Sequence, residues 1–315
     1  MRSPRNKTLS LDPATEAAYA ARCLTVTAPV SVADVTDTVI LGDTFAVLPN
    51  LPRGSVDLLI VDPPYNLTKD FHGDTFRRRD AESYRAFTER WLDAVTPLLK
   101  PTASLYVCCD WQSSLVIGDL LERRFRVRSR ITWQREKGRG AAKNWKNGCE
   151  DIWFATVSDD YTFCLDAVKV RRPVRAPYRE NGAPKDWQDT PDGRFRDTCP
   201  SNFWDDLTVP YWSMPENTEH PTQKPEKLIA KLILASSREG DLVLDPFLGS
   251  GTTAAVAKKL GRRFTGVEQN PRYAAWAQVR LERAETDRTI QGYEDGVFYS
   301  RGVAARKKQE NDENS

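Results

Sequence analysis

The stretch LVLDPFLGSGTTAAVA, residues 242–257, is patterned like a strand that ends in a glycine turn and continues as a helix. Its apolar start is typical of a buried strand, and a helix is expected over Thr252 to Leu260. Gly249 and Gly251 can adopt positive φ and let a ligand approach the backbone closely. The helix presents unpaired backbone N–H groups at its start, which suit an anion. The stretch therefore predicts a ligand-binding turn between a strand and a helix.

Strand and helix patterns alternate along most of the chain. Strands are expected at residues 38–43, 56–61, 103–109, 127–133, 151–156, 241–247 and 263–268, and helices at 81–99, 113–124, 225–237, 252–260 and 271–285. This alternation is typical of an α/β fold with a mostly parallel, Rossmann-like sheet and helices on both faces. Ligands of such sheets bind beyond the carboxyl ends of the strands. Asp43, Asp62 and the loop after Phe247 should therefore meet at one edge.

Several ligands could bind at the glycine turn. A P-loop is a poor match because no lysine follows the glycines, whereas NAD fits the G-x-G spacing alone. S-adenosylmethionine fits the same geometry, and Asp245 favours it because a carboxylate attracts a cationic amino group and repels a pyrophosphate. Glu268 ends the next strand, where a carboxylate would accept hydrogen bonds from a ribose. A tight turn without a ligand is the structural alternative.

A second motif, Asp62–Pro63–Pro64–Tyr65, follows the buried strand at 56–61. Proline fixes φ at about −65° and has no N–H, so this loop should be stiff and should present carbonyl oxygens. An acid and an aromatic ring at the ligand edge of the sheet indicate a site for a polar, planar group. The alternative is a rigid proline turn with Tyr65 in the core.

The distribution of charge says more about a partner than the total does. The sequence has 46 Lys and Arg against 44 Asp and Glu, whereas residues 122–146 hold ten basic side chains against two acidic ones. The same stretch contains Trp133 and Trp145, a combination that suits a nucleic-acid backbone. A solvated basic face is the alternative. The candidates for phosphate contacts are Arg135, Lys137, Arg139, Lys143 and Lys146.

Composition argues against a membrane protein and against a metalloprotein. No apolar run approaches the roughly 18 residues of a membrane span, and the N-terminus lacks the apolar segment of a secretory signal. The six cysteines form no C-x-x-C pair, and the sequence has two histidines. We therefore expect a cytoplasmic protein with reduced thiols, no metal and no membrane partner.

Together the motifs resemble those of the β-class amino-group DNA methyltransferases. Asp62–Tyr65 is similar to their Asp-Pro-Pro-Tyr tetrad, residues 245–253 to their S-adenosylmethionine motif, and HPTQKP at 220–225 to the segment before it. The resemblance implies that S-adenosylmethionine is the cofactor, that double-stranded DNA is the partner, and that the methylated base is flipped out. It also implies a bacterial restriction system and a monomer or weak dimer.

The motifs are compatible with two target bases. Overall similarity to adenine-N6 members of the family implies methylation of the inner adenine in GAATTC, whereas the motifs alone also fit an N4-cytosine enzyme. A C5-cytosine enzyme would need a Pro-Cys nucleophile, and this sequence has only the reverse order, Cys199–Pro200. An NAD-dependent oxidoreductase and a non-catalytic binding module are the alternatives from other classes.

The resemblance assigns a role to each matching residue. Asp62, Pro63, Pro64 and Tyr65 would be catalytic: the Asp62 carboxylate and the Pro63 carbonyl would hold the target amino group, and Tyr65 would stack on the base. The cofactor would contact Asp43, Asp62, Pro63, His220, Thr222, Lys224, Asp245, Phe247, Gly249, Ser250, Gly251, Thr252 and Glu268. Asp43 could instead cap a helix, and His220 could be a structural group.

The positions of the motifs divide the chain into five segments. Residues 1–34 would be peripheral, 35–134 the catalytic half of the methyltransferase domain, 135–218 a basic loop and target-recognition insertion, 219–288 the cofactor-binding half, and 289–315 a charged tail. Within the insertion, residues 157–218 lack helical periodicity and are expected to be irregular. The base-reading residues are expected there.

Overall fold

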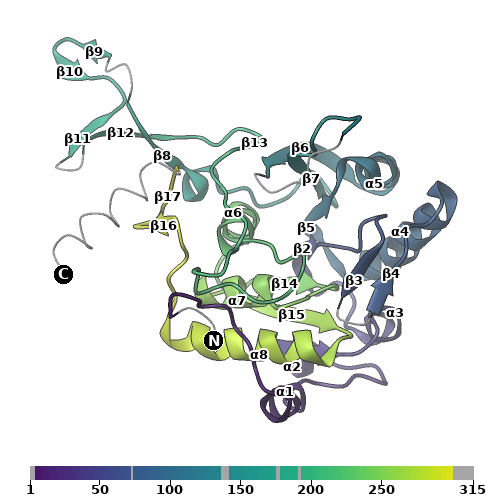
Figure 1. Ribbon diagram of the computed structural model, residues 1–315. Coiled ribbons are helices and arrows are strands. Elements are labelled where there is room, and N and C mark those ends of the chain that lie inside the picture. The colour runs from purple at the N-terminus through teal and green to yellow at the C-terminus, as the bar shows by residue number, and fades with distance from the viewer. Residues whose placement is uncertain (1–3, 72–73, 136–141, 175–177, 191–192, 301–315) are drawn as a thin grey trace.

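The computed structural model describes residues 4–71, 74–135, 142–174, 178–190 and 193–300. Its centre is an eight-stranded sheet of order β1-β15-β14-β2-β5-β7-β6-β13 (Figure 1). The strands are β1 (Thr38–Leu41), β2 (Val56–Val61), β5 (Leu99–Cys109), β6 (Arg126–Gln134), β7 (Cys149–Thr156), β13 (Phe203–Trp204), β14 (Leu242–Asp245) and β15 (Arg263–Glu268). Neighbouring strands are parallel except that β7 runs antiparallel to both β5 and β6. The predicted mostly parallel α/β fold is confirmed.

Helices cover both faces of this sheet. One face packs against α2 (Val32–Val35), α3 (Thr44–Val47), α4 (Ala81–Val95) and α5 (Trp111–Arg124); the other packs against α6 (Glu226–Ser236), α7 (Thr252–Lys259) and α8 (Pro271–Thr286), with α1 (Pro13–Ala20) outside α8. Successive residues of β14 point to opposite faces of the sheet. Val243 belongs to the core under α6, α7 and α8, and Leu244 belongs to the core under α2, α3, α4 and α5. Strands buried on both faces need continuous apolar runs, which is why the sequence pattern located them.

Part of the insertion forms a second sheet that the sequence did not predict. Its order is β11-β12-β8-β17-β16, with β8 (Val170–Pro173), β11 (Gln188–Thr190), β12 (Gly193–Thr198), β16 (Tyr293–Glu294) and β17 (Val297–Tyr299). The expectation of an irregular segment was therefore incomplete. These strands are too short for a clear alternating pattern, and β17, from the expected tail, pairs with β8 from a distant part of the chain.

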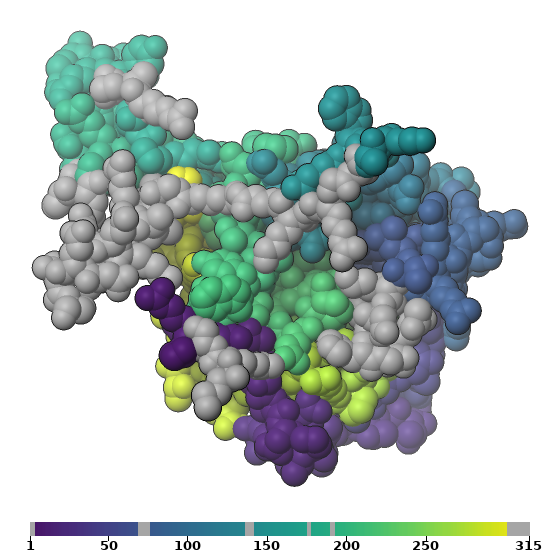
Figure 2. Space-filling model, viewed as in Figure 1, coloured from purple at the N-terminus to yellow at the C-terminus, as the bar shows by residue number. Residues whose placement is uncertain are grey.

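The insertion extends away from the main sheet. The small hairpin of β9 (Arg179–Glu180) and β10 (Ala183–Pro184) lies at its far end (Figure 1). The space-filling view shows this end standing clear of the main body, with a hollow between the two (Figure 2). The remaining elements are the hairpin of β3 (Lys69–Phe71) and β4 (Asp74–Phe76) and the 3-10 helices η1 (Leu48–Asn50), η2 (Thr96–Leu98) and η3 (Leu165–Val168). No described helix combines the length and the apolar character that a membrane span requires.

A buried ionic cluster joins the insertion to α6. Asp206 accepts hydrogen bonds from Lys231 at 2.6 and 2.7 Å and forms an ion pair with Lys227 at 2.8 Å. Lys227 also donates to the backbone carbonyl of Tyr299, the last residue of β17. Burial alone would raise the pKa of Asp206, but the two ammonium groups hold it below its usual value. The cluster thus fixes the insertion, α6 and the C-terminal strand to one another.

We predict that Asp206→Asn lowers the free energy of unfolding by about 3–5 kcal/mol, because it leaves two buried ammonium groups without their counter-charge. Urea unfolding followed by circular dichroism measures the change. Asp166→Asn is the control: Asp166 also pairs with a lysine, but its side chain is 91% exposed, so stability should hardly change. Equal stability of the two variants would contradict a structural role for the cluster.

Candidate active site

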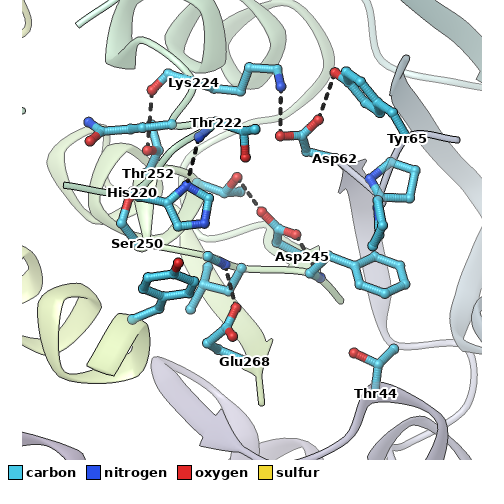
Figure 3. Close-up of a pocket in the computed structure, with 18 of the residues that line it drawn as sticks. Thr44, Asp62, Tyr65, His220, Thr222, Lys224, Asp245, Ser250, Thr252 and Glu268 are labelled. Carbon is cyan, nitrogen blue, oxygen red and sulfur yellow. Dashed lines mark hydrogen bonds and ion pairs between the residues drawn. The ribbon is translucent and has the colours of Figure 1, made fainter. Parts of the chain in front are cut away.

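One cavity lies at the carboxyl edge of the parallel strands (Figure 3). Its volume is about 530 Å³, within the range of about 300–1,000 Å³ common for small-molecule sites. Asp43 follows β1, Asp62 follows β2, and Asp245 and Glu268 end β14 and β15. All four carboxylates line the cavity because parallel strands bring their carboxyl ends to the same edge.

The glycine turn forms one wall of this cavity. Gly249 has φ 56°, and a Cβ atom there would lie 3.1 Å from His220 Nε2. Gly251 has φ 82°, and its Cβ would lie 2.5 Å from the Cβ of Ala277 on α8. Gly251 is not among the residues that line the cavity. Position 251 must therefore be a glycine so that the turn can pack against α8, whereas Gly249 lines the cavity itself.

Asp245 and Glu268 fix the glycine loop by accepting hydrogen bonds from it. Asp245 accepts hydrogen bonds from the backbone N–H of Phe247 at 3.0 Å and from the Thr253 hydroxyl at 2.6 Å. Burial raises the pKa of Asp245 to about 7. Glu268 accepts from the backbone N–H of Gly249 at 2.8 Å. Both acids therefore shape the loop and still face the cavity.

The segment HPTQKP lines the cavity beside the glycine turn. His220 packs against Tyr273, with ring centroids 4.5 Å apart, and accepts from the Thr222 N–H at 3.4 Å. The backbone carbonyl of Lys224 accepts a hydrogen bond from the Thr252 hydroxyl at 3.3 Å. The predicted residues Phe247, Ser250, Thr252, His220, Thr222 and Lys224 all line the cavity. Asp43 lines it too, and caps α3 by accepting from the Phe45 N–H.

The Asp-Pro-Pro-Tyr tetrad lies across the cavity from the glycine turn (Figure 3). Asp62 accepts from Lys224 Nζ at 2.6 Å through one carboxylate oxygen and from the Tyr65 hydroxyl at 2.9 Å through the other. Tyr84 donates to the carbonyl of Pro64 at 3.3 Å and so ties the loop to α4. Pro63, Pro64 and Tyr65 line the cavity together with Asp62. The structure thus brings the tetrad and the predicted cofactor-binding residues that line the cavity into one space.

Charge in this corner of the cavity is balanced. Burial alone would lower the pKa of Lys224, but the carboxylates of Asp62 and Glu150 raise it above its usual value. Burial, reinforced by the same two carboxylates, raises the pKa of Tyr65 well above its usual value. At neutral pH, Lys224 is therefore charged and Tyr65 is a neutral hydroxyl donor.

The sequence analysis did not predict that Glu150 and Arg135 would line the cavity. Glu150, at the start of β7, is buried and ion-paired with Arg135. Arg135 was predicted to contact DNA phosphates, but the structure places it in the cavity wall. The signal for Glu150 was weak: an acid at a strand start reaches the ligand edge only because β7 is antiparallel to the parallel strands. The sequence pattern did not predict that β7 would run antiparallel to its neighbours.

The other candidates for phosphate contacts fall into two groups. Lys137 and Arg139 lie outside the described residues. Lys143 and Lys146 are exposed and flank Trp145, a residue that is 94% exposed. Among the residues that the structure describes, no group of His, Cys, Asp and Glu is arranged to hold a metal ion.

The glycine turn after β14 and the stiff, acid-bearing proline loop after the neighbouring β2 lie at one edge of a Rossmann-like sheet, as expected for a methyltransferase. The profile of the DNA methylase family, which includes N6 and N4 enzymes, matches residues 56–279, and the chain belongs to that family.

Similar proteins come from several bacteria. The type II methyltransferase M.HpaI of Haemophilus parainfluenzae is 36% identical over 238 residues, 75% of this chain and 71% of the relative. The DNA adenine methyltransferase YhdJ of Escherichia coli K12 is 36% identical over 258 residues, 78% of this chain and 83% of the relative. The crystal structure of an M1.HpyAVI–SAM complex shares 25% identity, with a TM-score of 0.51, and the match covers 77% of this chain and 98% of that one.

We predict that Gly251→Ala destabilises the fold by about 1–3 kcal/mol beyond the cost of positive φ, because the new methyl group would overlap Ala277. Gly54→Ala is the matched control, since Gly54 also has positive φ, at 60°, but has no atom within 4 Å of its added Cβ. Urea unfolding of both variants gives the difference. Equal losses would show that α8 does not press on the turn.

Proposed function

We propose that the protein transfers a methyl group from S-adenosylmethionine to the N6 amino group of an adenine flipped out of double-stranded DNA. The observation that carries this proposal is the placement of the Asp62 carboxylate on a stiff proline loop in the same cavity as the glycine turn. A binding module would not require an acid held opposite the cofactor loop. An NAD-dependent oxidoreductase would leave the tetrad without a role.

The cavity residues suit each part of the cofactor, which supplies a methyl group activated on a positively charged sulfur. Glu268 would accept from the ribose hydroxyls, and Asp43 from the amino group of the cofactor's adenine. Asp245 would meet the cationic amino group, since it is a buried carboxyl that a positive ligand would help to ionise. Thr222 and Lys224 would hold the carboxylate.

Asp62 and Pro63 would prepare the nitrogen of the target base. The lone pair of an exocyclic amino group is delocalised into the ring, so two acceptors on its two N–H bonds favour a pyramidal, more nucleophilic nitrogen. The nitrogen–carbon bond forms as the carbon–sulfur bond breaks, and the electron pair of that bond remains on sulfur. The nitrogen gains a positive charge, which Asp62 stabilises, and it then loses a proton to solvent.

DNA would approach the face where the cavity opens. A base inside a duplex cannot reach Asp62, so the target must flip out, which costs a few kcal/mol. Tyr65, at the cavity wall, would stack on it. Lys143 and Lys146, exposed beside Trp145, would contact phosphates, and the insertion at 157–218 would read the sequence.

We further propose adenine as the target base and GAATTC as the site, with the protein acting as a monomer or weak dimer in the bacterial cytoplasm as the modification partner of a restriction system. The support is the resemblance of the sequence to adenine-N6 enzymes and the similarity to a relative described as a DNA adenine methyltransferase. N4-cytosine methylation is the second candidate, since the family includes both activities and Asp62 would hold either amino group.

Replacement of Asp62 tests the proposed chemistry. We expect Asp62→Ala to retain cofactor binding and to lose methyl transfer by about 10²–10³-fold or more, because the nitrogen loses its acceptor and its counter-charge. Incorporation of labelled methyl groups into DNA gives the rate, and calorimetry gives the cofactor affinity. Asp57→Asn, near the other end of β2, is the control. Turnover of Asp62→Ala near the wild-type rate would remove Asp62 from the mechanism.

The buried acid below the glycine turn makes cofactor affinity depend on pH. Because the pKa of Asp245 is raised to about 7, affinity for S-adenosylmethionine should rise as pH increases from 5.5 to 7, by up to about tenfold per pH unit. Above this value Asp245 is ionised and the rise ends. Titration calorimetry of the wild type and of Asp245→Asn measures the effect. A pH-dependent affinity that persists in Asp245→Asn would assign it to another group.

The exposed lysines should govern the salt dependence of DNA binding. Replacing Lys143 and Lys146 with glutamine should reduce the slope of log affinity against log salt by up to about 2, because two fewer counterions are released. Fluorescence anisotropy with a labelled duplex measures the slope. Lys258→Gln serves as control, since Lys258 lies at the end of α7 away from the cavity. An unaltered slope in the double variant would place the phosphate contacts elsewhere.

A further inference from the structure

Glu150 is a buried acid in the cavity to which neither the sequence motifs nor the proposed chemistry gives a role. Its side chain is 6% exposed, and one carboxylate oxygen is paired with Arg135. The other oxygen, Oε2, lies 3.2 Å from the Tyr65 hydroxyl and 3.5 Å from Lys224 Nζ. Glu150 therefore faces the catalytic tetrad with one oxygen while its other oxygen is bound by Arg135.

The two groups near Glu150 Oε2 are the same two that bind Asp62. Lys224 Nζ lies 2.6 Å from Asp62 Oδ2 and 3.5 Å from Glu150 Oε2. The Tyr65 hydroxyl lies 2.9 Å from Asp62 Oδ1 and 3.2 Å from Glu150 Oε2. Each donor thus has a shorter contact to Asp62 and a longer one to Glu150.

This arrangement raises a difficulty for the proposed function, on which the following inference rests. Asp62 must accept a hydrogen bond from the target amino group, but each of its oxygens already accepts one from a buried donor, which makes the carboxylate a weaker acceptor for the target. Moving a buried ammonium away from Asp62 would cost several kcal/mol if no other carboxylate lay nearby. Glu150 lies near both donors, so both can move away from Asp62 and keep a carboxylate acceptor in the protein.

We infer that Glu150 is a positioning residue that accepts Lys224 and the Tyr65 hydroxyl when Asp62 engages the target amino group. A displacement of the ammonium by about an ångström exchanges its closer partner without removing it from an ion pair. Arg135 holds the Glu150 carboxylate in place through its other oxygen, so that the second acceptor is present before the base arrives. In this role Glu150 acts on the reaction through Asp62 and does not touch the base.

Single-turnover kinetics of Glu150→Gln test the inference. The amide keeps the shape of the side chain but is a poor partner for an ammonium, so Lys224 should remain on Asp62. We expect the rate of methyl transfer at saturating DNA and cofactor to fall by about 10–100-fold. Cofactor affinity and the 2-aminopurine fluorescence of a flipped base should stay near wild-type values. Asp151→Asn, the next buried acid on β7, pairs with Thr132 and Arg130 and should leave the rate unchanged.

A second substitution separates a positioning role from general damage. Lys224 is also proposed to hold the cofactor carboxylate, so Glu150→Gln/Lys224→Gln should bind S-adenosylmethionine more weakly than Glu150→Gln. Once the cofactor is saturating, however, the double variant should transfer the methyl group no more slowly than Glu150→Gln if the retained ammonium is what slows the single variant. Independent effects would instead multiply and would overturn the inference. Glu150→Asp, which keeps the charge, should be faster than Glu150→Gln, and it provides the comparison with wild type if Glu150→Gln does not fold.

The outcomes distinguish the inference from the function on which it rests. A wild-type protein that transfers no methyl group to DNA would overturn the proposed function, and the role of Glu150 with it. If the wild type is active and both Glu150→Gln and Glu150→Asp transfer methyl groups as fast as the wild type, the inferred role of Glu150 fails and the proposed function stands. A loss of base flipping equal to the loss of rate in Glu150→Gln would likewise contradict it, because Glu150 would then act on base capture.

Discussion

The parallel pairing of β2 with β14 is the constraint on which the site depends. Leu58 and Leu59 of β2 lie beside Val243 and Leu244 of β14, and each strand is buried on both faces. Because the strands run the same way, the loops that follow them begin at the same edge. The acid of the proline loop and the acid of the glycine turn are therefore brought to one cavity by the sheet itself.

The two halves of the site achieve stability in different ways. In the cofactor half, Asp245 and Glu268 accept hydrogen bonds from the loop that they support, and burial leaves Asp245 with a raised pKa. In the tetrad half, charge is balanced: Asp62 and Glu150 alternate with Lys224 and Arg135. The first half is thus suited to a cationic ligand. The second can accept a neutral amino group without a change in total charge.

The sequence predicted the parts of the molecule that depend on local pattern. The strand at 56–61 and the acids at the ends of strands, such as Asp62 and Glu268, followed from apolar runs and from the rule that ligands bind at carboxyl ends. The parts that depend on pairing between distant segments could not be read in this way. Glu150 reaches the cavity through the antiparallel register of β7, and β17 completes the second sheet by pairing with β8.

Nucleoside analysis after reaction with labelled S-adenosylmethionine tests the central claim most directly. Plasmid DNA that contains GAATTC would be methylated, digested to nucleosides and separated, so that the labelled base is identified. The account predicts label in N6-methyladenine, and its loss when the inner adenine of that site is replaced. Label in N4-methylcytosine would contradict the choice of base, and unlabelled DNA from a protein that binds the cofactor would contradict methyl transfer to DNA.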